Sequence, residues 1–161
     1  MDAGQLFEQH HESLLRYLVR LTGDLDVAHD AAQETFARLV AKRPRSVNLR
    51  AWLYTVATNV VRTGANRTKR RAQLLTPERA PHGDPSASPE QHAIAADDRR
   101  RVRAALDALP ERDRVMLLMR EEGFSHREIA EATGTTTGSV GTLLARALDR
   151  LAELLALDAE P

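Results

Sequence analysis

The sequence predicts an all-α protein built from two small helical bundles joined by a flexible linker. Helix-forming residues such as Ala, Leu, Arg and Glu dominate both halves, and the apolar positions recur with helical spacing. Four of the seven prolines fall within residues 76–97, and the first part of that segment has no helical or strand periodicity. We therefore expect a first domain at 1–75, a linker at 76–97 and a second domain at 98–161.

The first half predicts three helices separated by two clear breaks. Asp24 and Asn48 are residue types that cap helix N-termini, while Gly23 and the loop around Pro44 interrupt the helical pattern. The helices are expected near residues 3–22, 24–42 and 48–74.

The second half predicts four helices. Pro110 suits the start of a helix, and Ser125 with Glu128 has the spacing of a capping box. Gly134 stands where a helix end favours a left-handed residue. The helices are expected near residues 90–108, 111–122, 126–133 and 137–156.

The segment 125–151 has the pattern of a helix-turn-helix. Ala130, Gly134 and Val140 have the spacing of a small residue at the helix crossing, a turn glycine and an apolar anchor. An ordinary helical hairpin without a ligand is the alternative. The second helix carries a buried stripe of Val140, Leu144, Ala147 and Leu151 and a polar stripe of Ser139, Thr142, Arg146 and Arg150 that would face a DNA groove.

The net charge of zero hides a strong segregation of sign. Residues 35–77 contain ten basic side chains and no acidic one. Residues 1–75 hold 12 basic and 7 acidic side chains, a net +5, whereas 76–97 and 98–161 carry −3 and −2. A solvated face usually mixes charges of both signs, so the acid-free stretch favours binding to a polyanion.

Two further patterns in the first half leave alternatives open. Asp26, Asp30 and Glu34 repeat every four residues on one helical face, which suits a cationic partner or simple solvation with a Glu34–Arg38 pair. Trp52 and Tyr54 precede a basic helix end and could stack on exposed bases. A core position is the alternative for Trp52, because apolar residues surround it, and Tyr54 fits either role.

Enzyme chemistry finds no support in the sequence. There is no cysteine, the six histidines lack metal-ligand spacing, and no phosphate-binding loop or nucleophile motif is present. We expect no catalytic residue, no metal and no cofactor. The lack of cysteine fits a reducing, cytoplasmic location, and neither a signal peptide nor a membrane-spanning stretch is expected.

Four stretches together resemble the extracytoplasmic-function (ECF) sigma factors of the bacterial sigma-70 family. They occur in the family's order on both sides of the variable linker, and the resemblance covers about 6–75 and 99–155. The stretches are Asp30-Ala-Ala-Gln-Glu-Thr-Phe-Ala-Arg-Leu39, Asn48-Leu-Arg-Ala-Trp-Leu-Tyr54 with Asn59, Ala108-Leu-Pro-Glu-Arg-Asp-Arg114 and Gly123-Phe-Ser-His-Arg-Glu-Ile-Ala130.

The resemblance implies a promoter-specificity subunit of RNA polymerase without catalysis of its own. The first half would be sigma region 2, which docks on the β′ subunit through Asp30, Gln33 and Glu34 and recognises and opens the −10 element. The second half would be region 4, which reads the −35 element and meets the β flap. The implied −10 residues are Arg43, Arg45, Asn48, Asn59, Arg62, Arg67, Lys69, Arg70 and Arg71, and the implied −35 residues are Thr137, Ser139, Thr142, Arg146 and Arg150.

Two departures from the family pattern are visible. The recognition helix has Gly141, Leu143 and Ala145 where basic or polar residues are frequent, so −35 binding is expected to be weak or to depend on DNA shape. Gly64 interrupts the −10 helix and predicts a kink or a local fraying point.

The sequence is compatible with three functions. The first is a sigma factor that binds core RNA polymerase and promoter DNA, with an anti-sigma factor as a further expected partner. The second is a stand-alone helix-turn-helix regulator, which the basic, aromatic-bearing first half disfavours. The third is a sigma-like protein-interaction module that has lost DNA binding, which the cation-poor recognition helix favours.

Overall fold

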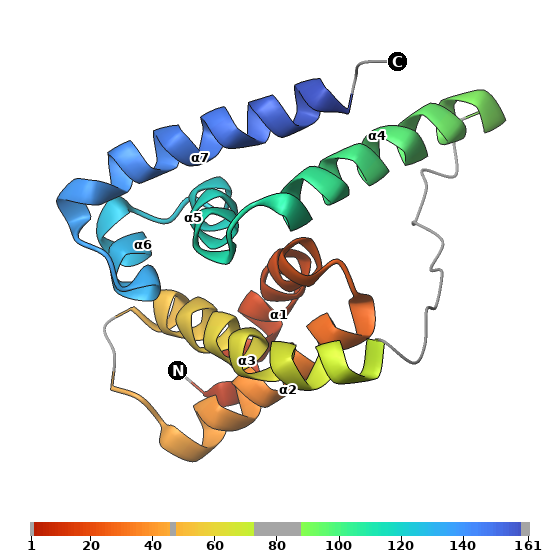
Figure 1. Cartoon of the computed structure of the whole chain (residues 1–161). Helices are drawn as coiled ribbons and strands as arrows, with labels where there is room; N and C mark the ends of the chain where they lie inside the picture. Colours follow the sequence, from red (N-terminus) through yellow and green to blue (C-terminus); the bar gives the residue numbers. More distant parts are fainter. Residues whose placement is uncertain (1, 46–47, 73–87, 159–161) are drawn as a thin grey trace.

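The computed structural model describes residues 2–45, 48–72 and 88–158, with the side chains of 65–72 outside that description. The described residues form seven α-helices and no strand, which confirms the all-α prediction. Each helix lies within two residues of its predicted bounds, apart from predicted positions 73–74, which the structure does not describe. The helices are α1 (Ala3–Thr22), α2 (Leu25–Lys42), α3 (Leu49–Ala72), α4 (Pro89–Ala108), α5 (Glu111–Glu121), α6 (His126–Thr133) and α7 (Thr137–Leu157) (Figure 1).

Helix α4 begins inside the segment predicted as linker. The Ser88 hydroxyl accepts a hydrogen bond from the Gln91 backbone N–H at 3.2 Å, and the Gln91 side chain accepts one from the Ser88 N–H at 3.0 Å. Pro89 occupies the first turn, where its missing N–H is harmless. Residues 89–97 are therefore helical, although they belong to the predicted linker of 76–97, and residues 76–87 lie outside the described part.

The predicted capping residues form the expected contacts. The Asp24 carboxylate accepts hydrogen bonds from the backbone N–H groups of Asp26 and Val27 at 2.9 and 3.2 Å, which satisfies the first turn of α2. Gly23 and Gly134 end α1 and α6 with φ angles of 72° and 68°. These left-handed conformations explain why glycine stands at both positions.

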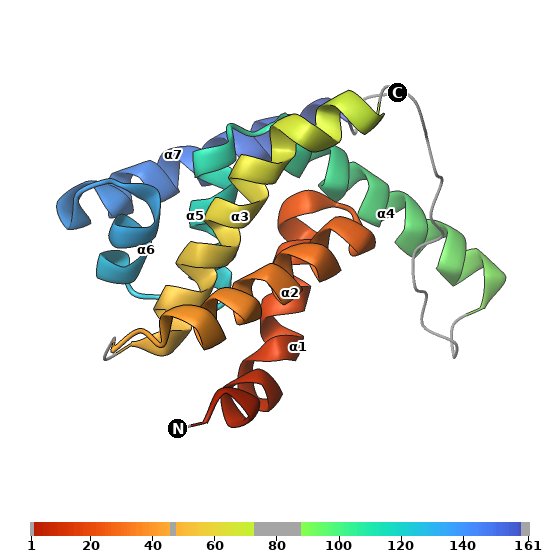
Figure 2. The same ribbon diagram turned by 90° about the horizontal axis from the view of Figure 1, so that it is seen from below.

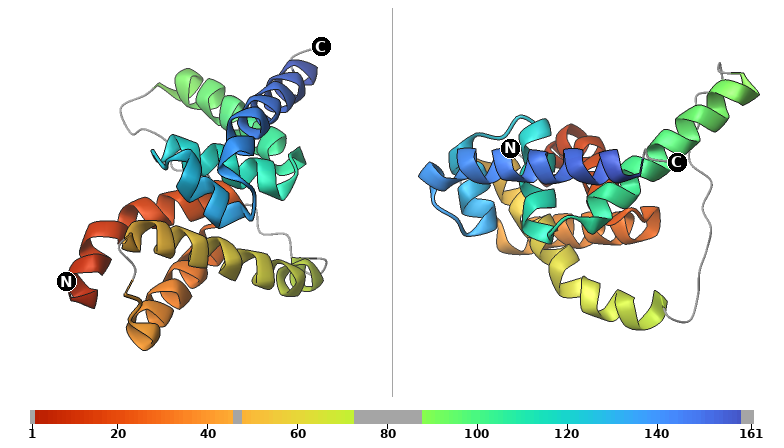
Figure 3. Two further views of the ribbon diagram at one scale, coloured as in Figure 1. Left: turned by 90° about the vertical axis from the view of Figure 1, so that its left-hand side faces the viewer. Right: turned by 45° about the horizontal axis from the view of Figure 1, so that its top comes forward.

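The helices form two layers that share one core. Helices α1–α3 make one layer and α4–α7 the other, and α3 lies between α2 and α6 (Figures 1, 2 and 3). Helix α1 also packs on α5. The buried apolar side chains form a single cluster to which the first layer contributes Leu14, Tyr17, Leu18, Phe36, Leu53 and Tyr54 and the second contributes Val115, Met116, Met119, Phe124, Ile129 and Val140.

A buried polar link fixes α3 against α1. The Tyr17 and Thr58 hydroxyls lie 2.8 Å apart, and Thr58 also donates to the Tyr54 carbonyl at 2.7 Å. Both side chains are fully buried, so each hydroxyl needs this partner. Burial raises the pKa of Tyr17 well above its usual value, which keeps the phenol neutral inside the core.

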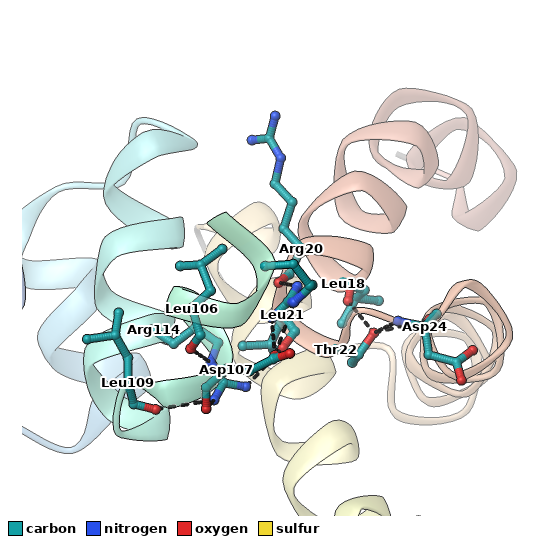
Figure 4. Close-up of polar contacts among 10 residues, drawn as sticks. Leu18, Arg20, Leu21, Thr22, Asp24, Leu106, Asp107, Leu109 and Arg114 are labelled. Atoms are coloured by element: carbon teal, nitrogen blue, oxygen red, sulfur yellow. Dashed lines mark hydrogen bonds and ion pairs between the residues drawn. The ribbon is translucent and has the colours of Figure 1, made fainter. Parts of the chain in front are cut away.

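Arg114 joins the end of α1 to the turn between α4 and α5 (Figure 4). Its guanidinium donates to the Leu106 carbonyl at 2.8 Å and to the Asp107, Leu109 and Leu21 carbonyls at 3.2 Å each. Partial burial lowers the pKa of Arg114. One side chain thus satisfies helix-end carbonyls from both layers.

Two glycine substitutions should change stability in opposite directions. Gly64 lies inside α3 with no atom within 4 Å of an added Cβ, so Gly64→Ala should stabilise the protein by about 0.5–1 kcal/mol. Gly23→Ala should destabilise it by about 1–2 kcal/mol, because φ is +72° and the Arg103 side chain lies 3.1 Å from the new Cβ. Urea unfolding measures both changes. A destabilised Gly64→Ala variant would show that α3 needs glycine for a kink.

Candidate nucleic-acid interface

Helices α6 and α7 form the helix-turn-helix that the sequence predicts. Ala130 is buried where the two helices pack together, and Val140 is buried at the start of α7. The Ser125–Glu128 capping box is present in both directions, with N–H to oxygen distances of 3.3 and 2.7 Å. The capping box therefore fixes where α6 begins, and Gly134 ends the helix before α7.

The outer face of α7 presents few groups that could contact DNA. Thr137, Thr142 and Arg146 are exposed, while Ser139 is half-buried and its hydroxyl lies 2.6 Å from that of Thr136. Gly141 is also exposed, but it has no side chain that could contact DNA. Arg146 and Arg150 are the two cations of this helix that are predicted as −35 contacts. Of the two, Arg146 has no ion pair recorded among the described residues and faces solvent.

Arg150 forms an ion pair within the protein. Its guanidinium donates to the Asp113 carboxylate of α5, whose side chain is 2% exposed, and Arg150 itself is half exposed. A buried carboxylate without a cation would be costly, so this pair has a structural role. The prediction of Arg150 as a −35 contact missed this role because Asp113 lies 37 positions away in the sequence.

The predicted docking residues lie together on the outer face of α2. Asp30, Gln33 and Glu34 are exposed there, while the opposite face of the helix is buried. The Glu34–Arg38 ion pair considered as an alternative is also present, at 2.9 Å between nitrogen and oxygen. Since both partners are 41–50% exposed, the pair contributes little and leaves the acidic face accessible.

The predicted −10 residues fall into three groups. Arg43, Arg45 and Asn59 are exposed, and Arg43 closes α2 with a φ of 42°. The side chains of Arg67, Lys69, Arg70 and Arg71 lie outside the described part of α3. Asn48 and Arg62 contact the second layer.

Both of these contacts are made to glutamates. The Asn48 side-chain amide donates to Glu128 at the start of α6, and the Arg62 guanidinium lies 3.3 Å from the Glu111 carboxylate at the start of α5. Arg20 on α1 pairs with Glu121 at 2.7 Å in the same way. In every recorded hydrogen bond or ion pair between side chains of the two described layers, the first half supplies the donor and the second half supplies the carboxylate.

Glu122 is the centre of the contact between the layers. Its side chain is 8% exposed, and its carboxylate lies 3.6 Å from Arg16 and 3.9 Å from Arg50. The Tyr54 hydroxyl donates to the same carboxylate at 3.4 Å, and Arg50 donates to the Glu122 carbonyl at 2.6 Å. Three side chains from α1 and α3 therefore surround a single acidic residue at the end of α5.

Aromatic rings pack beside this ionic centre. The Tyr54 ring lies 4.7 Å from the Phe124 ring in an edge-to-face arrangement, and the Arg50 guanidinium lies 4.1 Å above Phe124. Tyr54 is fully buried, so it has no free face for a base in this arrangement. Trp52 is half-buried, packs against the core, and also lines a cleft between α3 and α6.

Glu128 serves two contacts at once. Burial alone would raise the pKa of this carboxyl, but hydrogen bonds from the Ser125 backbone and hydroxyl and from Asn48, with the nearby Arg50 charge, bring the pKa below its usual value. Because the pKa is lowered on folding, the stabilisation is present at neutral pH and is lost as the pH falls through that lowered pKa. One glutamate therefore caps α6 and holds Asn48.

Sequence reasoning did not select Arg50, Glu122 or Phe124 as functional residues. Arg50 lies within the quoted Asn48–Tyr54 stretch, and Glu122 and Phe124 flank the glycine that ends α5. The opposite net charges of the two halves are the signal that could have indicated a contact between them.

Within the described part of the chain, no group of three or more acidic, histidine or cysteine side chains could hold a metal ion. None of the described helices is both long enough and apolar enough to span a membrane.

Comparison with known proteins places both halves in one family. The family model for sigma-70 region 2 matches residues 6–71, and the model for sigma-70 region 4 matches residues 99–151. The ECF RNA polymerase sigma factor EcfG of Rhodopseudomonas palustris is 32% identical over 151 residues, which cover 91% of this chain and 81% of the relative. SigE of Mycolicibacterium smegmatis is 32% identical and SigD of Mycobacterium tuberculosis 37% identical, with this chain spanning 61% and 60% of their lengths.

Two solved structures share the fold. The sigma factor RpoE from Bartonella quintana, in complex with the anti-sigma factor NepR, has a TM-score of 0.73 at 24% identity and covers 96% of this chain and 97% of its own. The PhyRSL–NepR complex from Sphingomonas sp. Fr1 has a TM-score of 0.66 at 26% identity and covers 100% of this chain and 94% of its own. With its two matched regions and its 32% identity to EcfG, the chain belongs to the ECF sigma factors of the sigma-70 family.

Proposed function

We propose that this chain binds core RNA polymerase and directs it to promoters by recognising −10 and −35 elements. The observation that carries the proposal is the presence of both sigma regions in family order, with an exposed acidic face on α2 and an acid-free basic stretch over residues 35–77. The acidic face suits a polymerase surface, and the basic stretch suits promoter DNA. The chain's role is binding, and we propose no catalytic activity and a cytoplasmic location beside the polymerase.

An inhibitor protein is a further proposed partner. Both of the solved structures described above are complexes with NepR, and that protein is named an anti-sigma factor in the complex with RpoE. We propose that an anti-sigma protein also controls this chain. A sigma-like interaction module without −35 reading is the second candidate, because Arg150 is tied to Asp113 and α7 presents few cations.

Run-off transcription tests the proposal directly. Core polymerase should produce promoter-dependent transcripts from a genomic fragment library when this chain is added, and none from the same fragments without it. Duplex DNA binding by the chain alone, without any such transcripts, would support the stand-alone regulator in place of the sigma factor.

Reversing the charge of Glu34 should weaken the contact with core polymerase. Glu34→Arg places a cation on the exposed acidic face of α2 and should lower the affinity for core polymerase by about tenfold or more, since like charges at an interface repel. Competition with the unmodified chain for core polymerase measures the effect. Glu8→Arg, an equal reversal at an exposed position of α1, is the matched control and should bind normally. Equal competition by both variants would contradict the docking surface.

The two arginines of α7 should give different phenotypes. Arg150→Ala leaves Asp113 buried without its main cation and should destabilise the protein by about 1–3 kcal/mol in urea unfolding. Arg146→Ala should change stability by less than about 0.5 kcal/mol but weaken DNA binding and reduce its salt slope by about one unit. An unchanged salt slope for Arg146→Ala would remove the exposed α7 cation that has no recorded ion pair from the proposed −35 interface.

A further inference from the structure

The helix-turn-helix carries no charge from the end of α6 to the middle of α7. Residues 132–145 contain no Asp, Glu, Lys, Arg or His. Arg146 is therefore the first cation of α7. The exposed residues that precede it on this helix are all small or uncharged, namely Thr137, Gly138, Gly141, Thr142 and Ala145.

His126 lies beside the gap that Gly141 leaves on α7. A Cβ added to Gly141 would be 3.6 Å from His126 Cε1, an ordinary van der Waals distance, so the imidazole reaches from α6 to the bare backbone of α7. His126 is exposed, and no hydrogen bond or ion pair of its ring is recorded with the described residues. An N–H of the ring is therefore available to an acceptor outside the chain.

The capping box holds the backbone from which this imidazole extends. His126 is the first residue of α6 and follows the cap directly. The Ser125 hydroxyl accepts from the Glu128 N–H at 3.3 Å, and the Glu128 carboxylate accepts from the Ser125 N–H at 2.7 Å. Because the backbone is already ordered, a contact made by the ring costs little further conformational entropy.

The charged groups of the surrounding elements already have partners. On α6, Arg127 pairs with Glu131 at 3.4 Å, and Glu128 accepts from Ser125 and Asn48. The helices packed against α6 are α7, α5 and α3. At the adjoining ends of α5 and α3 the charged side chains are paired with each other or with α1, as Glu121–Arg20, Glu122–Arg16 and Glu122–Arg50. A proton on the imidazole would therefore add a charge that no recorded pair neutralises.

The chemistry of imidazole suits a phosphate contact. Histidine changes its charge between about pH 5 and pH 8, and the charged ring has two N–H donors where the neutral ring has one. A DNA phosphate favours the charged ring, because a hydrogen bond between two ions is stronger than one from a neutral donor. Binding then takes up a proton, so the affinity for DNA rises as the pH falls.

We propose that His126 gives the −35 interface the cationic contact that Gly141 leaves out, by donating from its ring to a DNA phosphate. The contact is strong below neutral pH and weak above it. This inference rests on the proposed function, because it assumes that α7 faces −35 DNA.

The salt dependence of DNA binding at two pH values tests the contact. The full chain is titrated onto a random-sequence duplex of about 20 base pairs at about pH 6 and about pH 8, with fluorescence anisotropy as the measurement. The salt slope should be steeper at the lower pH, and His126→Gln should reduce this difference by up to about 0.9 unit, the value for one neutralised phosphate. The same variant should bind about threefold to tenfold more weakly near pH 6 and within about twofold of the unmodified chain near pH 8.

Two further variants control for the loss of the ring. His29→Gln removes an exposed histidine from α2 and should keep the full difference between the two pH values. His126→Arg carries a fixed charge, so it should bind near pH 8 at least as tightly as the unmodified chain does near pH 6. Urea unfolding of each variant shows whether the fold is intact.

The outcomes separate this inference from the proposed function. Equal affinity and equal salt slope for His126→Gln and the unmodified chain near pH 6 would overturn the inference. A loss of affinity that is the same at both pH values, with no change of slope, would give the ring a packing role and would also overturn it. Run-off transcription by the unmodified chain is measured in parallel. Without transcripts the proposed function fails, whereas a slope that depends on His126 still supports the DNA contact.

Discussion

The arrangement of this chain depends on the burial of one carboxylate, that of Glu122, between two layers of helices. Arg16, Arg50 and Tyr54 approach it from α1 and α3, and the Tyr54 ring packs on Phe124. An isolated charge buried to this degree would be expensive, so the surrounding donors make the contact specific. The apolar core then continues across the contact and includes residues of both halves.

This contact joins the two oppositely charged halves of a chain whose net charge is zero. A +5 first half would repel itself and attract any polyanion, whereas glutamates on the second half neutralise part of that surface. Regions of opposite net charge therefore pair with each other within a chain that is neutral overall. Asn48 and Arg62, two of the residues predicted to contact the −10 element, take part in this pairing.

Several residues carry a local and a long-range role at the same time. Glu128 caps α6 through one carboxylate oxygen and accepts from Asn48 through the other. Arg114 satisfies carbonyls at the end of α4 and also one at the end of α1. Arg150 lies on the polar stripe of α7 but neutralises Asp113. A substitution at any of these positions would change more than one property.

The helices, their caps and the helix-turn-helix could be predicted from the sequence, because they depend on neighbours within a few positions. Asp24, Ser125 and Gly134 adopt the predicted roles, and the apolar periodicity correctly places Val140 and Leu144 in the core. The family motifs likewise indicated the two sigma regions. The burial of Tyr54, the Arg150–Asp113 ion pair and the contact of Glu122 with the other layer depend instead on tertiary packing. These outcomes depend on partners 37 to 106 positions away, and side-chain spacing along one helix contains no information about such distant partners.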